Sequence, residues 1–438
     1  MTISTYWKAA RRPLYTALTL ATLGASIQAQ AADAELVKRG EYVAAAADCS
    51  VCHTEPGQKA YAGGHGIDSP FGAIYSTNIT PDEKTGIGSY SRDEFAAAVR
   101  EGIRKDGAHL YPAMPYTAYA GISDADIDAL YAYFMQGVEP AEQANKETDL
   151  GFPYNQRWGI TFWNWLFGGD DPYSNEAAAG DQRAAYLVDV LGHCGSCHTP
   201  RGTFFQEEAM TGDDKVYLSG ADIGGWHAPD IRAGKGGGLE QWSQADLEKY
   251  LQTGRNAHAA VVGEMKPVIE HSMAKLRDED IGLIAGYLKG LKGDGENQIT
   301  EGNGEATTAK LDSALLDVDS GERLYVDNCG ACHFSNAQGA DSVFPKLDRN
   351  PLVNAENPTG LIRVILAGAR LPSTAKAPED LAMPGFGWRL DDAEVATLAS
   401  FVRSGWNNKA AAVTSDQVAE VRKELSEEQL SASAPKFN

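Results

Sequence analysis

The sequence of 438 residues contains the pattern Cys-x-x-Cys-His three times, and the three motifs use all six of its cysteines. In chain order they are Cys49, Cys52 and His53; Cys194, Cys197 and His198; and Cys329, Cys332 and His333. Two thiols at this spacing can add across the vinyl groups of a haem, and the adjacent histidine can then ligate the iron from one face. A chain with three such motifs and no spare cysteine is therefore expected to fold around three covalently bound haem c groups.

Other uses of these cysteines explain the pattern less well. A thioredoxin-like pair needs a single Cys-x-x-Cys in a βαβ setting, and no such setting surrounds these motifs. A structural zinc site needs four ligands, usually from two pairs close in sequence, whereas these pairs are more than a hundred residues apart. Disulfide frameworks are typical of short secreted chains with little core, and this chain is long. The sequence favours haem attachment over all three.

Residues 1–31 have the features of a secretory signal peptide. A basic start is followed by a mostly apolar run over 14–27 and by small residues at Ala29 and Ala31. Export agrees with covalent haem attachment, which bacteria complete outside the cytoplasm. No other stretch approaches the length of a membrane span. The sequence thus predicts a periplasmic protein that contacts the membrane peripherally or through a partner.

The formal net charge of the chain is −22. A strongly acidic surface repels the phosphates of nucleic acids and of anionic lipids, so nucleic-acid binding is not expected. The charge favours solubility in the periplasm and by itself identifies no partner.

Three stretches downstream of the motifs share one apolar spacing. Apolar residues recur at i, i+3, i+4 and i+7 over 127–134, 281–288 and 395–402, which gives each stretch one apolar helix face. Ser123 and Asp391 precede two of these helices, where a side-chain oxygen can cap the first amides. A short helix before each motif and a closing helix after it make the layout of a small cytochrome c domain. The predicted fold is mainly α, with three tandem cytochrome c-like domains that each enclose one haem.

The predicted boundaries follow from the motifs and from changes in composition. They are a signal peptide over 1–31, a first domain over 32–140, an aromatic-rich segment over 141–180, a second domain over 181–292, a flexible linker over 293–312, a third domain over 313–408 and a tail over 409–438. We expect the aromatic segment to pack between domains; the alternative is that it faces a partner, a quinone or the bilayer surface. The tail is expected to form a surface helix.

Each predicted domain offers one methionine as the second axial ligand of its iron. The candidates are Met114, Met265 and Met383, each of which follows its motif, precedes the closing helix and has a proline one or two residues later. Met135 competes with the first and Met273 with the second, although Met135 is better explained as core. Methionine opposite histidine raises the reduction potential of a haem. Three irons with two axial ligands each leave no open site, so no catalytic residue is predicted in this chain.

The ring nitrogen of a ligating histidine that does not bind the metal usually donates a hydrogen bond to a carbonyl oxygen. Pro229 and Pro345, each in a loop after its motif, are candidates to supply that oxygen. Such a bond fixes the orientation of the ring.

Three further segments carry a resemblance to a known family. They are Ser76-Thr77-Asn78-Ile79-Thr80-Pro81, Phe152-Pro153-Tyr154-Asn155 with Trp163-Asn164, and Met383-Pro384-Gly385-Phe386-Gly387-Trp388-Arg389-Leu390. Together with the three motifs, they make the chain similar to the triple-haem cytochrome c subunits of membrane-bound bacterial alcohol, gluconate, sorbitol, fructose and aldehyde dehydrogenases. The similarity covers nearly the whole chain after the predicted signal peptide, from about Glu35 to Trp406.

The resemblance implies a route for electrons. A separate catalytic subunit that carries flavin or pyrroloquinoline quinone would oxidise a sugar, alcohol or polyol at a CH–OH group. Electrons would then pass through the three haems to ubiquinone at the periplasmic face of the cytoplasmic membrane. This chain has no Gly-x-Gly-x-x-Gly fingerprint after a strand, which agrees with a flavin held elsewhere.

Two other functional classes stay open. The first is a free periplasmic carrier that feeds a terminal oxidase, and stable co-purification with a large catalytic chain would count against it. The second is a haem enzyme with one open iron site. A spectral change on addition of carbon monoxide or cyanide would support that class.

Overall fold

The computed structural model describes residues 33–168, 180–293, 304–313, 316–317 and 320–434, and the predicted signal peptide lies outside them. Helices dominate and strands are few and short, which confirms the predicted mainly α fold class. No helix in these described ranges is long and apolar enough to cross a membrane. Below, the described residues up to 168, from 180 to 293 and from 304 onward are called the first, second and third units.

The first unit contains a motif helix, a small antiparallel sheet of order β1-β2-β3 and a closing helix. Residues 33–46 form the helix that leads to the motif. The other elements are α2 (Cys49–His53), β1 (Gly66–Ser69), β2 (Gly72–Tyr75), α3 (Arg92–Arg100), α4 (Tyr116–Tyr119), α5 (Asp124–Ala132), the π-helix η1 (Tyr133–Gly137), β3 (Asp149–Leu150) and α6 (Trp158–Phe167).

The second and third units repeat the order of motif helix, short ribbon and closing helix. The second unit contains η2 (Gly180–Gln182), α7 (Arg183–Ala185), η3 (Tyr186–Leu191), α8 (Gly195–His198), β4 (Ala221–Ile223), β5 (Trp226–Ala228), α9 (Gln244–Thr253), α10 (Met265–His271), η4 (Met273–Lys275) and α11 (Asp278–Gly290). The third contains α12 (Gly304–Asp312), α13 (Gly321–Asn328), α14 (Gly330–His333), α15 (Pro351–Asn354), α16 (Thr359–Ala367), β6 (Gly368–Arg370), β7 (Ala382–Pro384), α17 (Asp392–Ser404), α18 (Ser415–Glu424) and α19 (Glu427–Ser431).

The closing helices α5, α11 and α17 begin near the predicted positions. The Ser123 side chain accepts a hydrogen bond from the Asp126 amide at the start of α5. Asp391 and Glu394 form a reciprocal capping box at the start of α17, as predicted from the sequence. Helix α11 follows Arg277 and has no side-chain cap, but its first turn carries three acidic residues that favour the helix dipole.

The helix that leads to each motif crosses the closing helix at a glycine in the first and third units. A Cβ placed on Gly40 would lie 1.9 Å from the Ala129 carbonyl oxygen, and one on Gly321 would lie 2.5 Å from the Phe401 Cβ. These glycines therefore let two helix backbones approach closely, which brings the motif under the closing helix.

This close approach predicts that Gly40→Ala destabilises the first unit. The added methyl forces the two helices apart, and such overpacking costs about 1 to 3 kcal/mol. Gly286→Ala on α11 is the matched control, because a Cβ there meets no atom within 4 Å, and removing a helical glycine stabilises by about 0.5 to 1 kcal/mol. Thermal unfolding of the two variants checks the difference; equal melting temperatures would contradict the close crossing.

The buried apolar side chains of the described residues form two clusters. One cluster joins the first and second units and includes Val43, Ile127, Tyr186 and Ile281. The other lies within the third unit. The first two units therefore share a core, whereas the third unit has its own.

Two parts of the chain differ from the sequence-based expectations. Within the predicted flexible linker, residues 304–312 form α12, because Leu311 is buried in the third core and the Thr307 hydroxyl accepts from the Trp406 amide. The tail forms the predicted helix α18, but its apolar stripe, which includes Val418 and Val421, packs into the third core.

The aromatic segment packs between the first and second units only in part. Trp163 donates to the Phe204 carbonyl of the second unit, and the Phe167 ring contacts the Phe204 ring, but most of the large side chains of the segment are exposed. Phe152 is 82% exposed, and Trp158 and Trp165 are each 75% exposed. Only Ile160 of α6 is fully buried. One face of α6, from Ile160 to Phe167, attaches the helix to its neighbours, and the opposite face is exposed.

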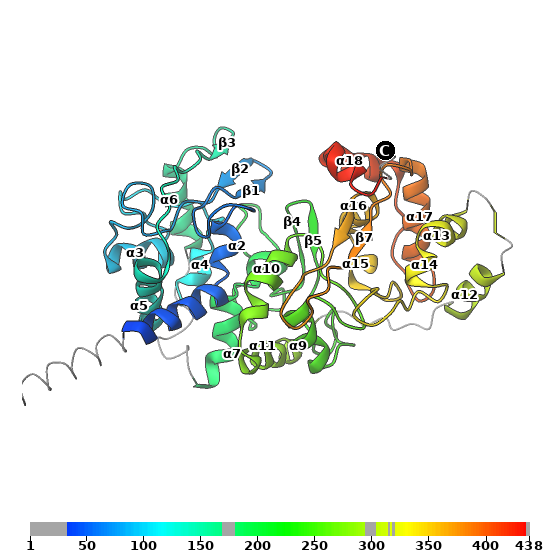
Figure 1. The fold of residues 1–438 in the computed structure, drawn as a ribbon, viewed down its shortest axis with the longest axis horizontal. Coiled ribbons are helices and arrows are strands. Elements are labelled where there is room, and N and C mark those ends of the chain that lie inside the picture. The colour runs from blue at the N-terminus through cyan, green and yellow to red at the C-terminus, as the bar shows by residue number, and fades with distance from the viewer. Residues whose placement is uncertain (1–32, 169–179, 294–303, 314–315, 318–319, 435–438) are drawn as a thin grey trace, which may run out of the picture.

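The three units lie in a row, with the second unit in the middle (Figure 1). The first unit, in blue to teal, is next to the green second unit, and the yellow to red third unit lies at the other end. Helix α6 lies on the first unit, beside the small sheet.

Candidate haem-binding sites

The three motifs form short helices at similar places in the three units. They are α2, α8 and α14, and each ends at the motif histidine. None of the six cysteines is in a disulfide. In the described ranges, no group of three or more His, Cys, Asp or Glu side chains is arranged to hold a metal ion. The six thiols are therefore free in pairs, as covalent attachment of haem requires, and they do not form a zinc cluster.

Each motif histidine is held by one carbonyl oxygen. The Nδ1 atoms of His53, His198 and His333 lie 2.7, 2.8 and 2.8 Å from the carbonyl oxygens of Thr77, Pro229 and Pro345. A carbonyl can only accept, so Nδ1 carries the hydrogen and the lone pair is left on Nε2. This arrangement confirms the predicted roles of Pro229 and Pro345.

The carbonyl partner of the first histidine was not predicted. Thr77 lies in the 76–81 segment that carried part of the family resemblance, but its residue type gives no sign of a backbone role. Burial lowers the pKa of His53, His198 and His333 below the usual range, with the carbonyl bond opposing that effect. The rings are consequently neutral at neutral pH, which is the form that binds iron.

The three candidate methionines occupy three kinds of local structure. Met114 lies in the loop before α4, Met265 is the first residue of α10, and Met383 is in β7, opposite Ala369. All three are half-buried and pack against the core of their own unit. The competing Met273 is 5% exposed and lies inside the shared core.

The first and second motifs lie close together. Helix α10 packs against α2. Burial raises the pKa of Cys52 to about 12, and the neighbouring Asp48 and Cys197 add to that rise. The third motif belongs to the separate core of the third unit.

Asp48 lies at the junction of the first two motifs. Its side chain is buried, and burial raises its pKa to about 8, with Lys275 opposing. Its Oδ1 atom has no hydrogen-bond partner in the described part of the chain. A buried oxygen without a partner points to a group that completes the site. The donor set and this oxygen fit a bound haem, which the cysteines would attach and the motif histidine would ligate, with the methionines as candidates for the second ligand.

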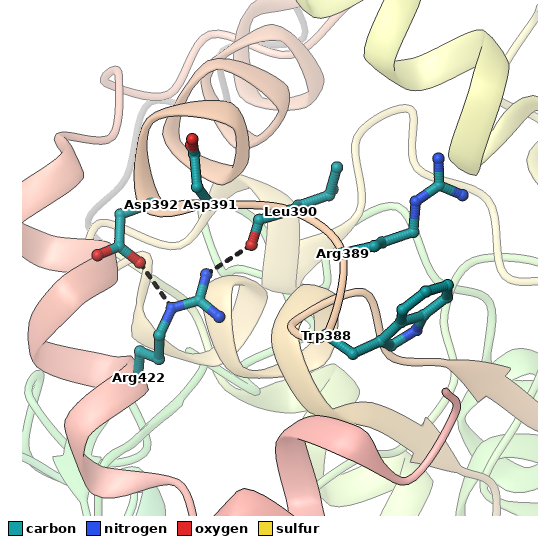
Figure 2. Close-up of a pocket in the computed structure, with 6 residues that line it drawn as sticks. All are labelled: Trp388, Arg389, Leu390, Asp391, Asp392 and Arg422. Carbon is teal, nitrogen blue, oxygen red and sulfur yellow. Dashed lines mark hydrogen bonds and ion pairs between the residues drawn. The ribbon is translucent and has the colours of Figure 1, made fainter. Parts of the chain in front are cut away.

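An open hollow of about 380 Å³ lies on the third unit and is lined by none of these residues (Figure 2). Arg422 of α18 donates to Asp392 Oδ1 at 2.7 Å and to the Leu390 carbonyl at 2.8 Å. The guanidinium also donates to the Gly387 carbonyl. These contacts fasten the tail helix to the start of α17, which accounts for the buried stripe of the tail.

Comparison with known proteins gives one family. The cytochrome c family model matches residues 37–137 and 318–406, which contain the first and third motifs. The gluconate 2-dehydrogenase cytochrome c subunit of Pantoea cypripedii is 45% identical over 417 residues, which cover 93% of this chain and 94% of that protein.

Two further relatives extend this similarity. The cytochrome c subunit of the quinone alcohol dehydrogenase of Gluconobacter oxydans is 43% identical, over 87% of this chain and 81% of that protein. The fructose dehydrogenase cytochrome subunit of Gluconobacter japonicus is 39% identical, over 94% and 90%. Because the similarity covers most of this chain and most of each relative, this chain belongs to the family of cytochrome c subunits of bacterial gluconate, alcohol and fructose dehydrogenases.

Proposed function

We propose that this chain carries electrons through three covalently bound haem c groups, from the catalytic subunit of a dehydrogenase to ubiquinone in the membrane. The main support is that each of three motif histidines has its Nδ1 tied to a carbonyl oxygen and its Nε2 left for iron. Bound haem supplies one-electron chemistry, at a potential raised by methionine ligation.

Different residues attach each haem and ligate its iron. The cysteines Cys49, Cys52, Cys194, Cys197, Cys329 and Cys332 attach the three groups, and His53, His198 and His333 with Met114, Met265 and Met383 ligate the irons. The carbonyl bonds keep each ring in one tautomer, so little rearrangement is needed when the iron changes charge.

The donor of electrons is a separate catalytic subunit. The relatives are named as cytochrome subunits of dehydrogenases, which supports a partner that oxidises a CH–OH group with flavin or pyrroloquinoline quinone. This arrangement places the chain at the periplasmic face of the cytoplasmic membrane, after export by the signal peptide over 1–31.

The contact with the membrane is proposed at an exposed aromatic surface. It consists of Phe152, Tyr154, Trp158, Phe162, Trp165, Leu166, Phe204 and Phe205. Along α6, the exposed side chains recur at i, i+4, i+7 and i+8, so they share one helix face. This helix contains no charged residue, although the whole chain has a net charge of −22. Tryptophan and phenylalanine on a helix without charged residues suit the headgroup region of a bilayer.

Purification of the tagged chain from its native membranes in mild detergent tests the proposal. We expect a dehydrogenase catalytic subunit to co-purify, identified by mass spectrometry, and its substrate to reduce both the haems and added ubiquinone. A chain found alone in the periplasmic fraction would favour the free carrier. A shift in the spectrum of the reduced protein with carbon monoxide would reveal an open iron site and contradict three histidine–methionine pairs.

A further inference from the structure

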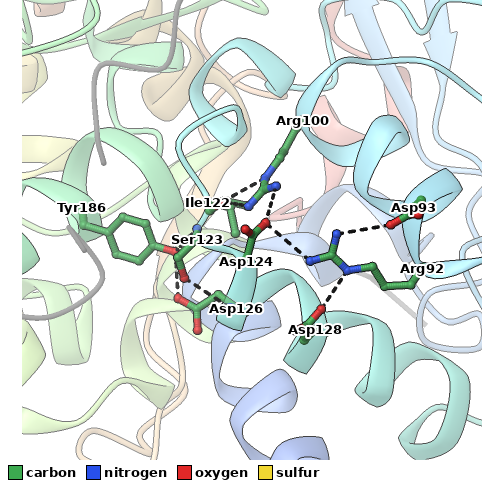
Figure 3. A network of polar contacts seen from close by, with 9 residues as sticks. All are labelled: Arg92, Asp93, Arg100, Ile122, Ser123, Asp124, Asp126, Asp128 and Tyr186. Atoms are coloured by element: carbon green, nitrogen blue, oxygen red, sulfur yellow. Dashed lines mark hydrogen bonds and ion pairs between the residues drawn. The ribbon is translucent and has the colours of Figure 1, made fainter. Parts of the chain in front are cut away.

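The first and second units are joined by a buried polar contact around Asp126 of α5 (Figure 3). The Tyr186 hydroxyl, from the second unit, donates to Asp126 Oδ2 at 2.7 Å and accepts from the Ser123 amide at 3.2 Å. Arg39 donates to Asp126 Oδ1 at 2.9 Å from the helix before the first motif. The tyrosine ring and the carboxylate are both buried. A tyrosine of one unit thus caps the closing helix of the other.

The reverse contact exists around Asp280 of α11. The Tyr42 hydroxyl, from the first unit, donates to Asp280 Oδ2 and accepts from the Arg277 amide at 3.3 Å. Arg183 donates to both carboxylate oxygens of Asp280 at 2.7 Å. The two contacts together are called the crossed latch below.

The two halves of the crossed latch are equivalent by position. Arg39 lies three residues before Tyr42 in the first unit, and Arg183 lies three residues before Tyr186 in the second. Each carboxylate is the third residue of its closing helix. Each tyrosine reaches the carboxylate of the other unit. The first and second units are therefore related by an approximate two-fold arrangement, in which the same patch on each unit meets the other.

The third unit uses the equivalent position differently. Glu394 is the third residue of α17, and its carboxylate accepts from the Asp391 amide of its own helix. The helix before the third motif has Arg323 at the position equivalent to Tyr42, and its Tyr325 donates to the Phe334 carbonyl within the same unit at 2.6 Å. The crossed latch is thus specific to the first two units.

The contacts between the second and third units include the buried Arg255, which pairs with Glu379, and more exposed pairs. Lys249 pairs with Asp341 at 3.1 Å, where both side chains are largely in solvent. Arg363 donates to the Gly225 carbonyl at 2.9 Å. Exposed ion pairs contribute little to stability because water competes for both partners. Among the described residues, the third unit has its own cluster of buried apolar side chains, whereas the first two units share one.

The charges of the crossed latch are balanced inside the interface. Burial tends to raise the pKa of Asp280, but hydrogen bonds from Arg183, Tyr42 and Arg277 outweigh it and hold the pKa at about 2. Buried carboxylates with several donors fix geometry more than they add free energy, because desolvation offsets the attraction. Removal of one donor therefore loosens the orientation of the units without exposing a large apolar area.

On the basis of the proposed function, we infer that Tyr42 and Tyr186 are positioning residues that fix the first two motif helices, α2 and α8, at one separation. The two haems attached there would exchange electrons within a pair of units that share one core, while the third haem would be carried on a unit with a core of its own. Cys52 of the first motif and Cys197 of the second lie near each other, beside the buried Asp48.

The double variant Tyr42→Phe with Tyr186→Phe tests the inference, because phenylalanine keeps the ring and removes only the hydroxyl. Tyr325→Phe is the matched control, since it removes a hydroxyl bond that stays inside the third unit. We expect all proteins to retain three haems. Electron exchange between the first two haems after flash photoreduction should slow in the double variant, because electron tunnelling falls steeply as the separation of the haems grows. The magnetic coupling of that pair in the oxidised protein should weaken, and the control should keep both signals.

A double variant with a lower melting temperature but unchanged exchange rate and coupling would overturn the inference, because the crossed latch would then be only structural. If the double variant loses haem, Tyr42→Phe alone gives the same comparison, since its ring is only half-buried. A wild-type protein with fewer than three haems would contradict the proposed function itself, and haem analysis detects that before the variants are compared.

Discussion

Replacing Cys329 and Cys332 by alanine is expected to lower the haem content from three to two per chain and to leave the first and second units intact. The third motif lies in a core that shares no buried residue with the other two. Loss of its haem removes apolar contacts only from that core, in which Cys329 is itself buried. The absorbance of the alkaline pyridine haemochrome relative to protein measures the count.

The equivalent change in the first motif, Cys49→Ala with Cys52→Ala, is expected to have a wider effect. The first and second units share one core, so a cavity in the first unit reaches the second. Limited proteolysis with mass spectrometry should show new cleavage in both units for this variant, and in the third unit alone for the Cys329 and Cys332 variant. In the Cys49 and Cys52 variant, cleavage confined to residues before 168 would show that the shared core does not couple the first and second units.

The sequence predicts the local features of the haem sites because covalent attachment needs a fixed spacing. The Cys-x-x-Cys-His motif places two thiols and a histidine on one helical turn, and α2, α8 and α14 have that form. The carbonyls of Pro229 and Pro345 could be anticipated because proline recurs in the loops after the motifs. The carbonyl of Thr77 could not, because any residue type can present a backbone oxygen.

The relation between the units was harder to predict. Tyr42 and Asp280 are 238 residues apart in the chain, and neither has a pattern that marks it as an interface residue. Asp126 and Asp280 look like ordinary first-turn acids of closing helices, where a carboxylate usually favours the helix dipole. Only the three-dimensional arrangement distinguishes them from Glu394, which does cap its own helix.

The aromatic segment packs between the first and second units only through Trp163 and Phe167, so the sequence-based expectation is correct only in part. Large aromatic side chains are usually buried, so the sequence favoured packing between domains. In the structure, however, α6 is attached through Ile160, through Asn164, which accepts from the Tyr116 hydroxyl at 2.7 Å, and through Trp163, which donates to the Phe204 carbonyl. Helix α6 is apolar on its exposed face as well as on its buried face. Such an exposed face indicates contact with another apolar surface.

Replacing Trp158, Phe162 and Trp165 by serine is expected to release the purified protein from vesicles of phosphatidylethanolamine and phosphatidylglycerol. Burial of each of these side chains in the bilayer interface is worth about 1.5 kcal/mol or more. The loss of three therefore lowers the binding constant by about a thousandfold. The folded protein should be unaffected because all three side chains are already exposed, and the haem spectrum verifies this.

A control variant separates the aromatic surface from exposed apolar side chains in general. Val326, Val343 and Trp388 are each about 40% exposed on the third unit, and their replacement by serine should leave vesicle binding unchanged. Co-sedimentation of both variants with the vesicles makes the comparison. Equal binding of the two variants would contradict a membrane contact through α6. If only the α6 variant is released, the surface contacts the bilayer directly, and the partner subunit is not needed to bring this chain to the membrane.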